Sequence, residues 1–228
     1  LDNRDPATAY EVSVMATDGA GNEGEAATAT LMTADRTGQA PYPRLQAIPG
    51  VIDAESFDTG GEGVAYHDTT PGNKVNKDYD AGIEIRSESD VDIGAAGGEY
   101  NVGFIVPGEW LEYTIEVPST GYYDIAYDVA AGGGGGGTFH LEIDGIDVTG
   151  PVTVDPTGGW ETYATRGPVT KVPLAEGTHV LRFQLDSGGF NLEQFEFTRM
   201  AGTELDRSNW SVTPMASFHD ANGTRAID

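Results

Sequence analysis

Residues 110–130 have the sequence WLEYTIEVPSTGYYDIAYDVA, and this stretch decides the fold class. Its two halves are rich in Tyr, Val, Ile and Thr, which favour β-strands, and a Pro-Ser-Thr turn separates them. We therefore expect strands at 110–117 and 121–130. Similar segments recur on both sides, which predicts an all-β fold: a β-sandwich of jelly-roll type with two antiparallel sheets. The other expected strands are 48–55, 102–106, 138–143, 151–154, 160–165, 179–185 and 190–198.

Composition narrows the classes of partner. The 228 residues include 12 Lys and Arg against 37 Asp and Glu, and the formal net charge of −25 repels nucleic acid and anionic membrane surfaces. No run approaches the roughly 20 apolar residues of a membrane span. Without Cys, the chain can form neither disulfides nor Cys-based zinc sites, so Ca²⁺ held by carboxylates is the expected stabilising metal. An acid-rich chain suits salt water, and we expect a secreted protein of a marine bacterium.

Two glycine-flanked segments hold the most informative side chains: Thr157-Gly158-Gly159-Trp160 and Gly188-Gly189-Phe190-Asn191-Leu192. Glycine in a turn lets a large aromatic side chain stand out from the fold. An exposed ring beside a side-chain amide suits a sugar, because the ring covers the apolar face of a pyranose and the amide binds its hydroxyls. Taken alone, the pair fits equally well a Trp that folds back onto the core.

Six motifs, each weak by itself, occur in order with consistent spacing over about 150 residues. Together they resemble the family 6 carbohydrate-binding modules, and the resemblance implies one sugar-binding module over residues 48–200. The motifs are Ile52-Asp53-Ala54-Glu55, GGEGVAYHDT at 60–69, Tyr100-Asn101-Val102-Gly103-Phe104-Ile105, Gly108-Glu109-Trp110-Leu111-Glu112-Tyr113 and the two glycine-flanked segments above.

The two ends of the chain differ from this module. Residues 1–33 contain two alternating strand patterns and, with Pro6-x-Thr8-x-Tyr10 in the place of a tyrosine corner, resemble the C-terminal part of a fibronectin type III domain. Residues 34–47 are expected to form a linker. Residues 201–228 are expected to contain a linker and the truncated start of a discoidin-like domain, which LDRSNWSV at 205–212 resembles. We therefore expect a monomeric module within a multidomain chain.

The resemblance also implies which residues bind sugar. In the family, two aromatic rings hold a sugar among the loops at one end of the sandwich, and an amide and an acidic residue bind its hydroxyls. Phe104 and Trp160 match the rings and Asn191 the amide, while His67 stands where relatives often carry Glu, and Tyr100 is expected to line the same mouth. The alternative for Phe104 is a core residue that follows the strand alternation.

Three further features receive structural interpretations. Trp110 matches a position that forms a second site on a sheet face in some relatives, but an aromatic within a strand usually points inward, so we expect it to pack the core. The six glycines at 132–137 lack the Gly-Lys-Ser/Thr of a phosphate loop and are expected to form a flexible connection. The polar insertion at 70–98 is expected to form a long loop near the binding mouth.

Asp53 and Glu55 are two residues apart on the expected first strand, so their carboxylates would share one face. Two close carboxylates repel each other unless a cation lies between them. The resemblance implies a structural Ca²⁺ here, completed by Glu193 and by backbone carbonyls near Tyr100. The alternative is two solvated acids on an edge strand.

The expected function is non-catalytic binding of a neutral polysaccharide, which targets a secreted glycoside hydrolase to its substrate. β-1,3-Glucan or agarose, bound at the non-reducing chain end, is the expected ligand, and xylan is the next candidate. Two alternatives stay open. One is a hydrolase that uses Glu142 and Asp144, although Asp144-Gly145 also predicts a hairpin turn. The other is a structural spacer without sugar affinity.

Overall fold

The computed structural model describes residues 9–17, 19, 21–32, 38–79 and 81–201, which form two compact units. The first unit contains an antiparallel hairpin of β1 (Ala9–Val14) and β2 (Ala27–Met32). The two strands expected in this part of the chain are confirmed. The fibronectin-like and discoidin-like assignments depend on Pro6, Thr8 and residues 204–228, which lie outside the described residues.

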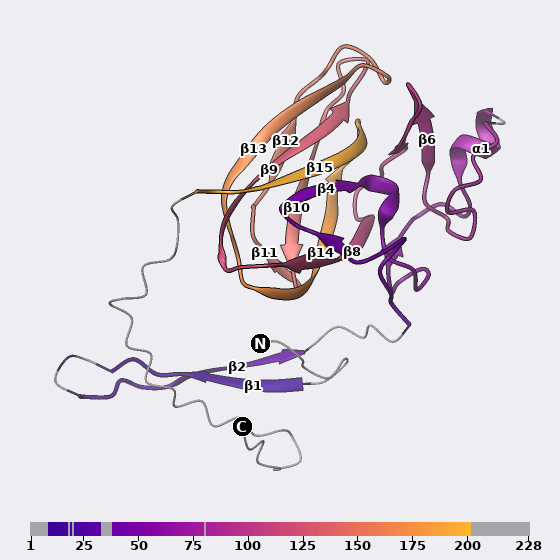
Figure 1. The fold of residues 1–228 in the computed structure, drawn as a ribbon. Helices are drawn as coiled ribbons and strands as arrows, with labels where there is room; N and C mark the ends of the chain where they lie inside the picture. Colours follow the sequence, from indigo (N-terminus) through magenta and orange to yellow (C-terminus); the bar gives the residue numbers. More distant parts are fainter. Residues whose placement is uncertain (1–8, 18, 20, 33–37, 80, 202–228) are drawn as a thin grey trace. The chain divides into compact units, whose positions relative to one another are not determined.

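The second unit, which begins at Gly38, is a sandwich of two sheets (Figure 1). All pairings of its strands are antiparallel except that of β3 with β8, and the predicted all-β sandwich is confirmed. One sheet has the order β11 (Ile146–Asp147), β10 (Gly137–Ile143), β14 (Gly177–Ser187), β8 (Trp110–Val117) and β3 (Gln46–Ala47), with β12 (Val152–Val154) on β10 and β5 (Tyr66–His67) on β8. The other has the order β13 (Tyr163–Leu174), β9 (Gly121–Ala130), β15 (Asn191–Arg199), β7 (Glu99–Val102) and β6 (Ile93–Ala96), with β4 (Gly50–Asp53) on β15.

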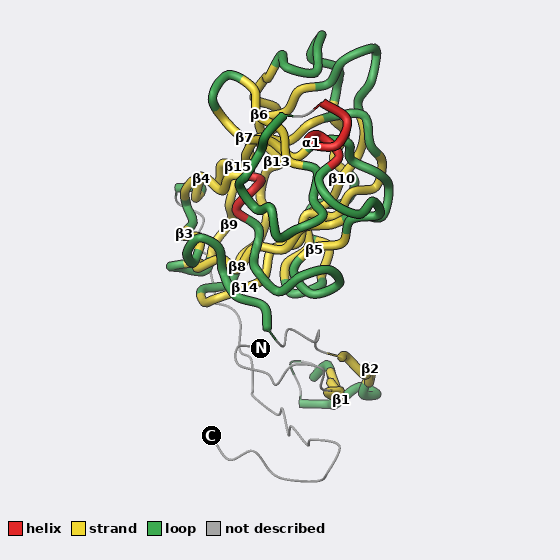
Figure 2. The backbone as a smooth tube through the Cα atoms, turned by 90° about the vertical axis from the view of Figure 1, so that its right-hand side faces the viewer, coloured by secondary structure: helices red, strands yellow, loops and turns green. Residues whose placement is uncertain are grey.

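Two short helices accompany the strands. They are the 3₁₀ helix η1 (Ala54–Ser56) and α1 (Lys74–Tyr79), and α1 lies beside β6 (Figures 1 and 2). In the described part of the chain, no helix is both long and apolar enough to cross a membrane. The insertion at 70–98 was expected to form a long loop. It instead contains a helix and a strand, α1 and β6.

The stretch at 110–130 supplies one long strand to each sheet, so the turn between β8 and β9 connects the two layers. Along β9, Tyr123, Ile125 and Tyr127 are buried, and the residues between them are half-buried. Because side chains alternate across a strand, this pattern aims one face of β9 at the other sheet.

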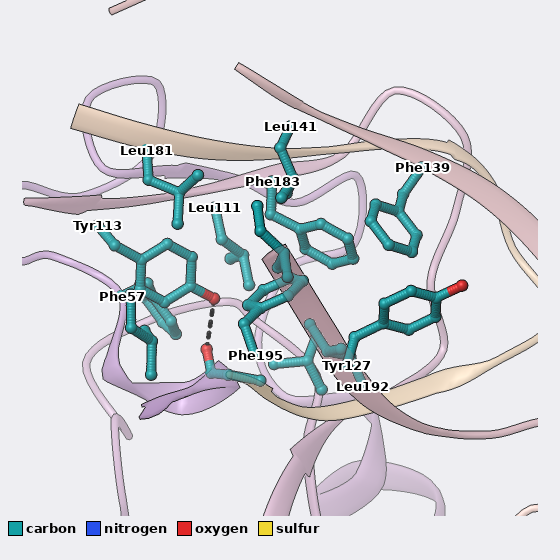
Figure 3. Packing of buried hydrophobic residues seen from close by; sticks show 14 of the residues in the cluster. Phe57, Leu111, Tyr113, Tyr127, Phe139, Leu141, Leu181, Phe183, Leu192 and Phe195 are labelled. Carbon is teal, nitrogen blue, oxygen red and sulfur yellow. Dashed lines mark hydrogen bonds between the residues drawn. The ribbon is translucent and has the colours of Figure 1, made fainter. Parts of the chain in front are cut away.

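Aromatic rings fill the space between the sheets (Figure 3). The ring of Phe139 lies edge-on to that of Phe183, with centroids 5.0 Å apart, and to that of Tyr127 at 5.1 Å. Phe183 in turn packs against Phe195 at 5.2 Å. Edge-to-face pairs contribute about 0.5–1.5 kcal/mol beyond their buried area. Because the rings come from both sheets, the cluster holds the two layers together.

Residues 38–47 belong to the sandwich, so the linker expected over 34–47 is wrong for most of its length. Gln39 Nε2 donates hydrogen bonds to the carboxylates of Asp58 and Glu112, each at 2.9 Å. Both acids are buried and need such donors. The Pro- and Gly-rich composition of this segment suggested a linker, but composition does not reveal these long-range bonds.

Two strand boundaries differ from expectation in an informative way. β7 ends at Val102 instead of continuing to residue 106, and β13 begins at Tyr163 instead of residue 160. Phe104 follows the end of β7, and Trp160 precedes the start of β13. These two residues belong to loops rather than to strands.

Candidate functional site

A cavity of about 700 Å³ opens between α1, β6, the loop after β7 and the turns before β13 and β15. Three of the expected site residues, Phe104, Trp160 and Asn191, line it together. The lining also includes Val75, Tyr79, Gly94, Ala95, Ala96, Asn101, Gly103, Ile105, Glu161, Gly189 and Phe190.

Phe104 owes its position to an unusual backbone conformation. Its φ is +48°, in the left-handed region that aromatic residues rarely adopt. The chain turns sharply at this point, and the Phe104 side chain remains 37% exposed within the cavity lining. The alternative of a core residue is therefore excluded. Backbone strain of this kind is retained where the surrounding structure enforces it, commonly at binding sites.

Trp160 and Asn191 are coupled directly. Asn191 Nδ2 donates a hydrogen bond to the Trp160 carbonyl oxygen at 3.0 Å, which joins the turn before β13 to the start of β15. The Trp160 side chain is 50% exposed, so it does not fold back onto the core. The Asn191 Oδ1 atom lies so close to Gly103 that a methyl group there would meet it at 2.8 Å.

A second amide, Asn101, lines the cavity, whereas the expected Tyr100 does not. Both residues are on β7, where neighbouring side chains point to opposite faces. Tyr100 is 37% exposed outside the lining, and Asn101 is buried at the cavity wall. The motif contained both residues, but only the pairing of β7 with β6 decides which one faces the cavity.

The six glycines at 132–137 are closely packed, which contradicts the flexible connection expected there. A methyl group on Gly136 would lie 2.4 Å from the Val154 carbonyl oxygen, and one on Gly189 would lie 2.5 Å from the carbonyl oxygen of Gly136. The other members of the run either have similarly close neighbours or adopt a left-handed φ. Only glycine permits such a close approach of backbone segments.

The first glycine of this run lies against the indole of Trp160. A methyl group on Gly132 would lie 2.8 Å from Cδ1 and 2.9 Å from Nε1 of the Trp160 ring. The missing side chain therefore leaves room for the ring to rest on the backbone. Gly132 is a positioning residue for Trp160.

His67 does not reach the cavity, although the sequence grouped it with the sugar site. β5 pairs with β8, and this sets His67 opposite Trp110, with ring centroids 6.4 Å apart. The Nδ1 atom of His67 also lies 2.5 Å from a carboxylate oxygen of Glu62. Strand register, which the sequence motif did not contain, therefore places His67 on the first sheet, away from the cavity.

The core position expected for Trp110 is wrong. Its neighbour Leu111 is buried in the core, so the alternation along β8 turns Trp110 to the outer face of the sheet. There the guanidinium carbon of Arg182 lies 4.2 Å from the centroid of the indole, a cation–π contact.

Glu142 and Asp144 do not line the cavity. Glu142 Oε1 lies 3.4 Å from His140 Nε2, and Asp144 Oδ1 accepts a hydrogen bond from the Val180 amide at 3.0 Å. Both Asp144 and Gly145 have positive φ, as a type I′ hairpin turn requires, so the predicted hairpin is confirmed. The two acids have structural partners, and nothing in their placement favours a joint catalytic role.

The expected strand geometry of Asp53 and Glu55 is wrong, because β4 ends at Asp53 and Glu55 belongs to η1. Ala54 is buried, and its carbonyl oxygen accepts a hydrogen bond from the Tyr113 hydroxyl at 2.8 Å (dashed line in Figure 3). This bond turns the chain inward after β4 and fixes the helix.

Glu55 is a partly buried acid with too few hydrogen-bond donors for its carboxylate. Its Oε2 atom is buried without a hydrogen-bond partner among the described residues. Burial, together with the charges of Asp53, Glu99 and Glu193, raises the pKa of Glu55 to about 7. Glu99 was not predicted as part of this group. In the described part of the chain, no three acidic or His side chains stand close enough to form a ready metal site.

Within the insertion at 70–98, two acids near its end hold the segment that precedes α1. Asp90 Oδ1 accepts a hydrogen bond from the Gly72 amide at 2.6 Å, and Asp92 accepts one from the Lys74 amide at the start of α1. Charge-assisted bonds of this type are stronger than neutral ones. They fix the segment that leads into α1.

Asp92 and the neighbouring Asp68 are costly to ionise in the folded state. Burial and the nearby carboxylates of Asp68 and Glu109 raise the pKa of Asp92 to about 7. Burial and the charge of Glu109 likewise raise the pKa of Asp68 to about 6. The segment before α1 is thus held by acids whose charged forms repel one another.

The cavity itself carries little charge. Among the residues that line it, Glu161 is the only acid, and none is Lys or Arg. Exposed rings, two amides and a nearly uncharged wall suit a ligand with apolar faces and neutral hydroxyls.

A β-sandwich whose loops hold exposed rings and amides in a cavity defines a ligand-binding module. Residues 77–199 match the family described as carbohydrate binding module (family 6), and the chain belongs to this family. Modules of this family are generally non-catalytic.

The chain is similar to parts of three larger curated proteins. It is 31% identical over 120 residues to the clotting factor G alpha subunit of Tachypleus tridentatus, covering 52% of this chain and 17% of that protein. It is 27% identical over 159 residues to an exo-beta-D-glucosaminidase of Amycolatopsis orientalis, covering 68% and 14%. It is 32% identical over 65 residues to the beta-agarase AgaA of Microbulbifer thermotolerans, covering 28% and 15%.

Two solved structures of family 6 modules are similar to this chain, and the first of them supports the fold. The module CsCBM6-3 of Clostridium stercorarium, in complex with cellobiose, is 18% identical with a TM-score of 0.51, covering 69% of this chain and 99% of that one. The C-terminal family 6 module of LamC, a laminarinase of Zobellia galactanivorans, is 34% identical with a TM-score of 0.43, covering 48% and 89%.

The contact between Gly132 and Trp160 yields a first prediction. In Gly132→Ala, the added methyl group displaces the indole. Overpacking of this kind costs about 1–3 kcal/mol, so we expect affinity for the sugar ligand to fall about tenfold. Isothermal titration measures the affinity. The matched control is Gly121→Ala, whose methyl group meets the flexible end of Arg199 at 3.3 Å and lies outside the cavity lining. Equal losses in both variants would contradict the positioning role.

The acids of the insertion yield a second prediction. Because folding raises the pKa of Asp92 from 3.8 to about 7, the folded state binds this proton more tightly, and stability from this group is lost as pH rises through that window. Asp92→Asn cannot ionise but can still accept the Lys74 hydrogen bond. We therefore expect its melting temperature to fall less between pH 4 and pH 7. The exposed Asp155→Asn serves as control, and identical pH slopes in Asp92→Asn and wild type would refute the effect.

Proposed function

We propose that the cavity binds a neutral polysaccharide and that the module thereby targets a secreted glycoside hydrolase to it. One observation carries the proposal: the exposed rings of Phe104 and Trp160 share one cavity with the amides of Asn101 and Asn191. Rings cover the apolar faces of sugars, and amides both donate to and accept from hydroxyls. These are the two kinds of contact that a neutral sugar offers.

Charge supports a neutral ligand over a sulfated or uronate polymer. The cavity lining contains Glu161 and neither Lys nor Arg. The Lys74 ammonium beside the Phe104 ring is paired with Asp78. Because the chain also has a net charge of −25, we expect it to repel anionic polymers. β-1,3-Glucan and agarose are the ligands that we favour, bound at a non-reducing chain end, and xylan is the next candidate. The beta-agarase among the relatives supports a hydrolase context of this type.

Targeting is a tethering effect. A module that holds the polymer converts the next encounter of a linked enzyme with its substrate into an intramolecular one, which raises the effective concentration. No change in the enzyme's own active site is needed. The exo-beta-D-glucosaminidase and the beta-agarase, which are far longer than the matched segments, fit such an arrangement.

We also propose that Ca²⁺ stabilises the module at the acids around η1. Glu55 Oε2 is buried without a partner, which fits a site designed for a cation, and Asp53, Glu99 and Glu193 supply further hard oxygen atoms nearby. Repulsion among these acids is relieved when a divalent cation binds. Carbonyl oxygens around Tyr100 would complete the shell.

Sugar binding is tested by isothermal titration with laminari-, neoagaro- and xylo-oligosaccharides, with calcium present and with product analysis. We expect micromolar to millimolar affinity for one series, and at least about a tenfold loss in Trp160→Ala and in Asn191→Ala. The matched control is Ile146→Ala, which removes an exposed apolar side chain outside the cavity.

Each other result points to a different function. Unchanged affinity in Trp160→Ala would mean that the cavity is not the sugar-binding site. No affinity for any series would favour a structural spacer, and release of shorter oligosaccharides would establish a hydrolase instead.

The calcium proposal predicts that a chelator lowers the melting temperature and that added Ca²⁺ restores it. A ligand at about one hundred times its Kd stabilises the folded state by roughly 2.7 kcal/mol. In Glu55→Gln the response to Ca²⁺ should shrink or vanish, because a buried anionic oxygen is lost. Mg²⁺ at equal concentration is the control for ionic strength. Identical melting curves with chelator and with Ca²⁺ would contradict the proposal.

A further inference from the structure

The helix α1 contributes an aromatic ring to the cavity that no sequence motif identified. Val75 and Tyr79, one helical turn apart, both line the cavity that contains Phe104 and Trp160. The Tyr79 side chain is 69% exposed, so it is not a core residue, and its ring centroid lies 6.0 Å from that of Phe104. An exposed ring in a cavity is available to a ligand.

Hydrogen bonds from the insertion hold α1 in place, although a helix of six residues would not be stable by itself. Asn73 Oδ1 accepts hydrogen bonds from the amides of Val75 at 2.9 Å and Asn76 at 3.3 Å, which caps the helix. The Asn76 side chain donates to the Ile83 carbonyl and accepts from the Ile83 amide, both at 2.7 Å. Asn73 Nδ2 donates a hydrogen bond to the carbonyl oxygen of Ile93 in β6 at 2.8 Å, which attaches the start of the helix to the sheet. Tyr79 is thus presented by an anchored element, as a binding residue requires.

A contact from the other end of α1 ties the helix to Phe104. The Lys74 Nζ atom lies 5.2 Å from the centroid of the Phe104 ring and pairs with Asp78, which is four residues further along α1. Phe104 therefore meets α1 at both of its ends, through Lys74 and through Tyr79. The positions of the two rings relative to each other are set by this packing.

The geometry of the ring pair favours one shape of ligand. The planes of Tyr79 and Phe104 are inclined by 37°, so the two rings do not form a flat platform. A β-1,4-linked glucan is a flat ribbon, and only one of the rings can lie flush with it. A β-1,3-linked glucan turns between neighbouring units, so that consecutive units can face two inclined rings. Shape complementarity of this kind sets specificity in a preformed cavity.

We propose that Tyr79 forms a second stacking position beside that of Phe104 and Trp160, and that it selects curved β-1,3-linked glucan chains over flat β-1,4-linked ones. This inference rests on the proposed function, because it takes the first sugar to lie at Phe104 and Trp160. Tyr79 then contacts the next unit along the chain, and it contributes only when the ligand is long enough to reach it.

The test uses two ligand series that share one sugar and differ in linkage, laminari- and cello-oligosaccharides, from glucose to the tetrasaccharide. We expect wild-type affinity for the laminari series to rise with length. In Tyr79→Ala the gain on lengthening should be lost, about tenfold for the loss of one stacking ring, while affinity for the shortest bound ligand is unchanged. Tyr79→Phe should retain the gain, because it retains the ring.

The control variants separate this inference from the proposed function. Ile146→Ala removes a side chain that is 68% exposed, almost as exposed as Tyr79, and should bind like wild type. Wild-type affinity at every length in Tyr79→Ala, combined with a loss in Trp160→Ala, would overturn the role of Tyr79 alone. Equal length dependence in the cello series would overturn the selection by linkage. Wild-type protein that binds neither series would overturn the β-1,3-glucan assignment on which the inference rests.

Discussion

Close packing of two glycine-rich backbone segments, 132–137 and 188–189, is the constraint on which the binding cavity depends. A methyl group on Gly188 would lie 2.0 Å from the Ile105 carbonyl oxygen, so no other residue fits between this turn and the loop after β7. The same turn packs on the glycine run that leads into β10. Loops from both sheets therefore meet without side chains between them, and Phe104, Trp160 and Asn191 are brought to one place.

The acidic residues of this chain are distributed in a way that serves the cavity. Buried acids such as Asp92 accept backbone hydrogen bonds from the insertion, and others gather around Glu55 at η1. In both groups, burial and neighbouring carboxylates make the charged form of an acid unfavourable. A bound proton or cation offsets this cost. The cavity contains only Glu161 among acids, so its chemistry stays that of rings and amides. Charged side chains therefore stabilise the structure around the cavity, and mostly neutral groups line it.

Sequence reasoning succeeded where local composition determines the structure. The strands at 110–117 and 121–130 match β8 and β9, because β-favouring residues bounded by turns leave few alternatives. It failed where a side chain's direction depends on a partner strand. Trp110 faces outward because Leu111 beside it fills the core, and His67 accompanies Trp110 through the pairing of β5 with β8. A shift of one residue in register would reverse both directions.

The sequence by itself determined the β-sandwich, the family and the grouping of Phe104, Trp160 and Asn191 as site residues, because strand-forming residues and Gly-Gly turns act over a few neighbouring positions. Only the tertiary structure decided that the glycine run is packed and that Asn101 replaces Tyr100 in the cavity wall. It alone brought Tyr79 to Phe104, since these residues are distant in sequence and Asp92, which directly precedes β6, accepts a hydrogen bond from the first residue of α1. Contacts between distant segments depend on register and on long-range hydrogen bonds, which local sequence patterns do not encode.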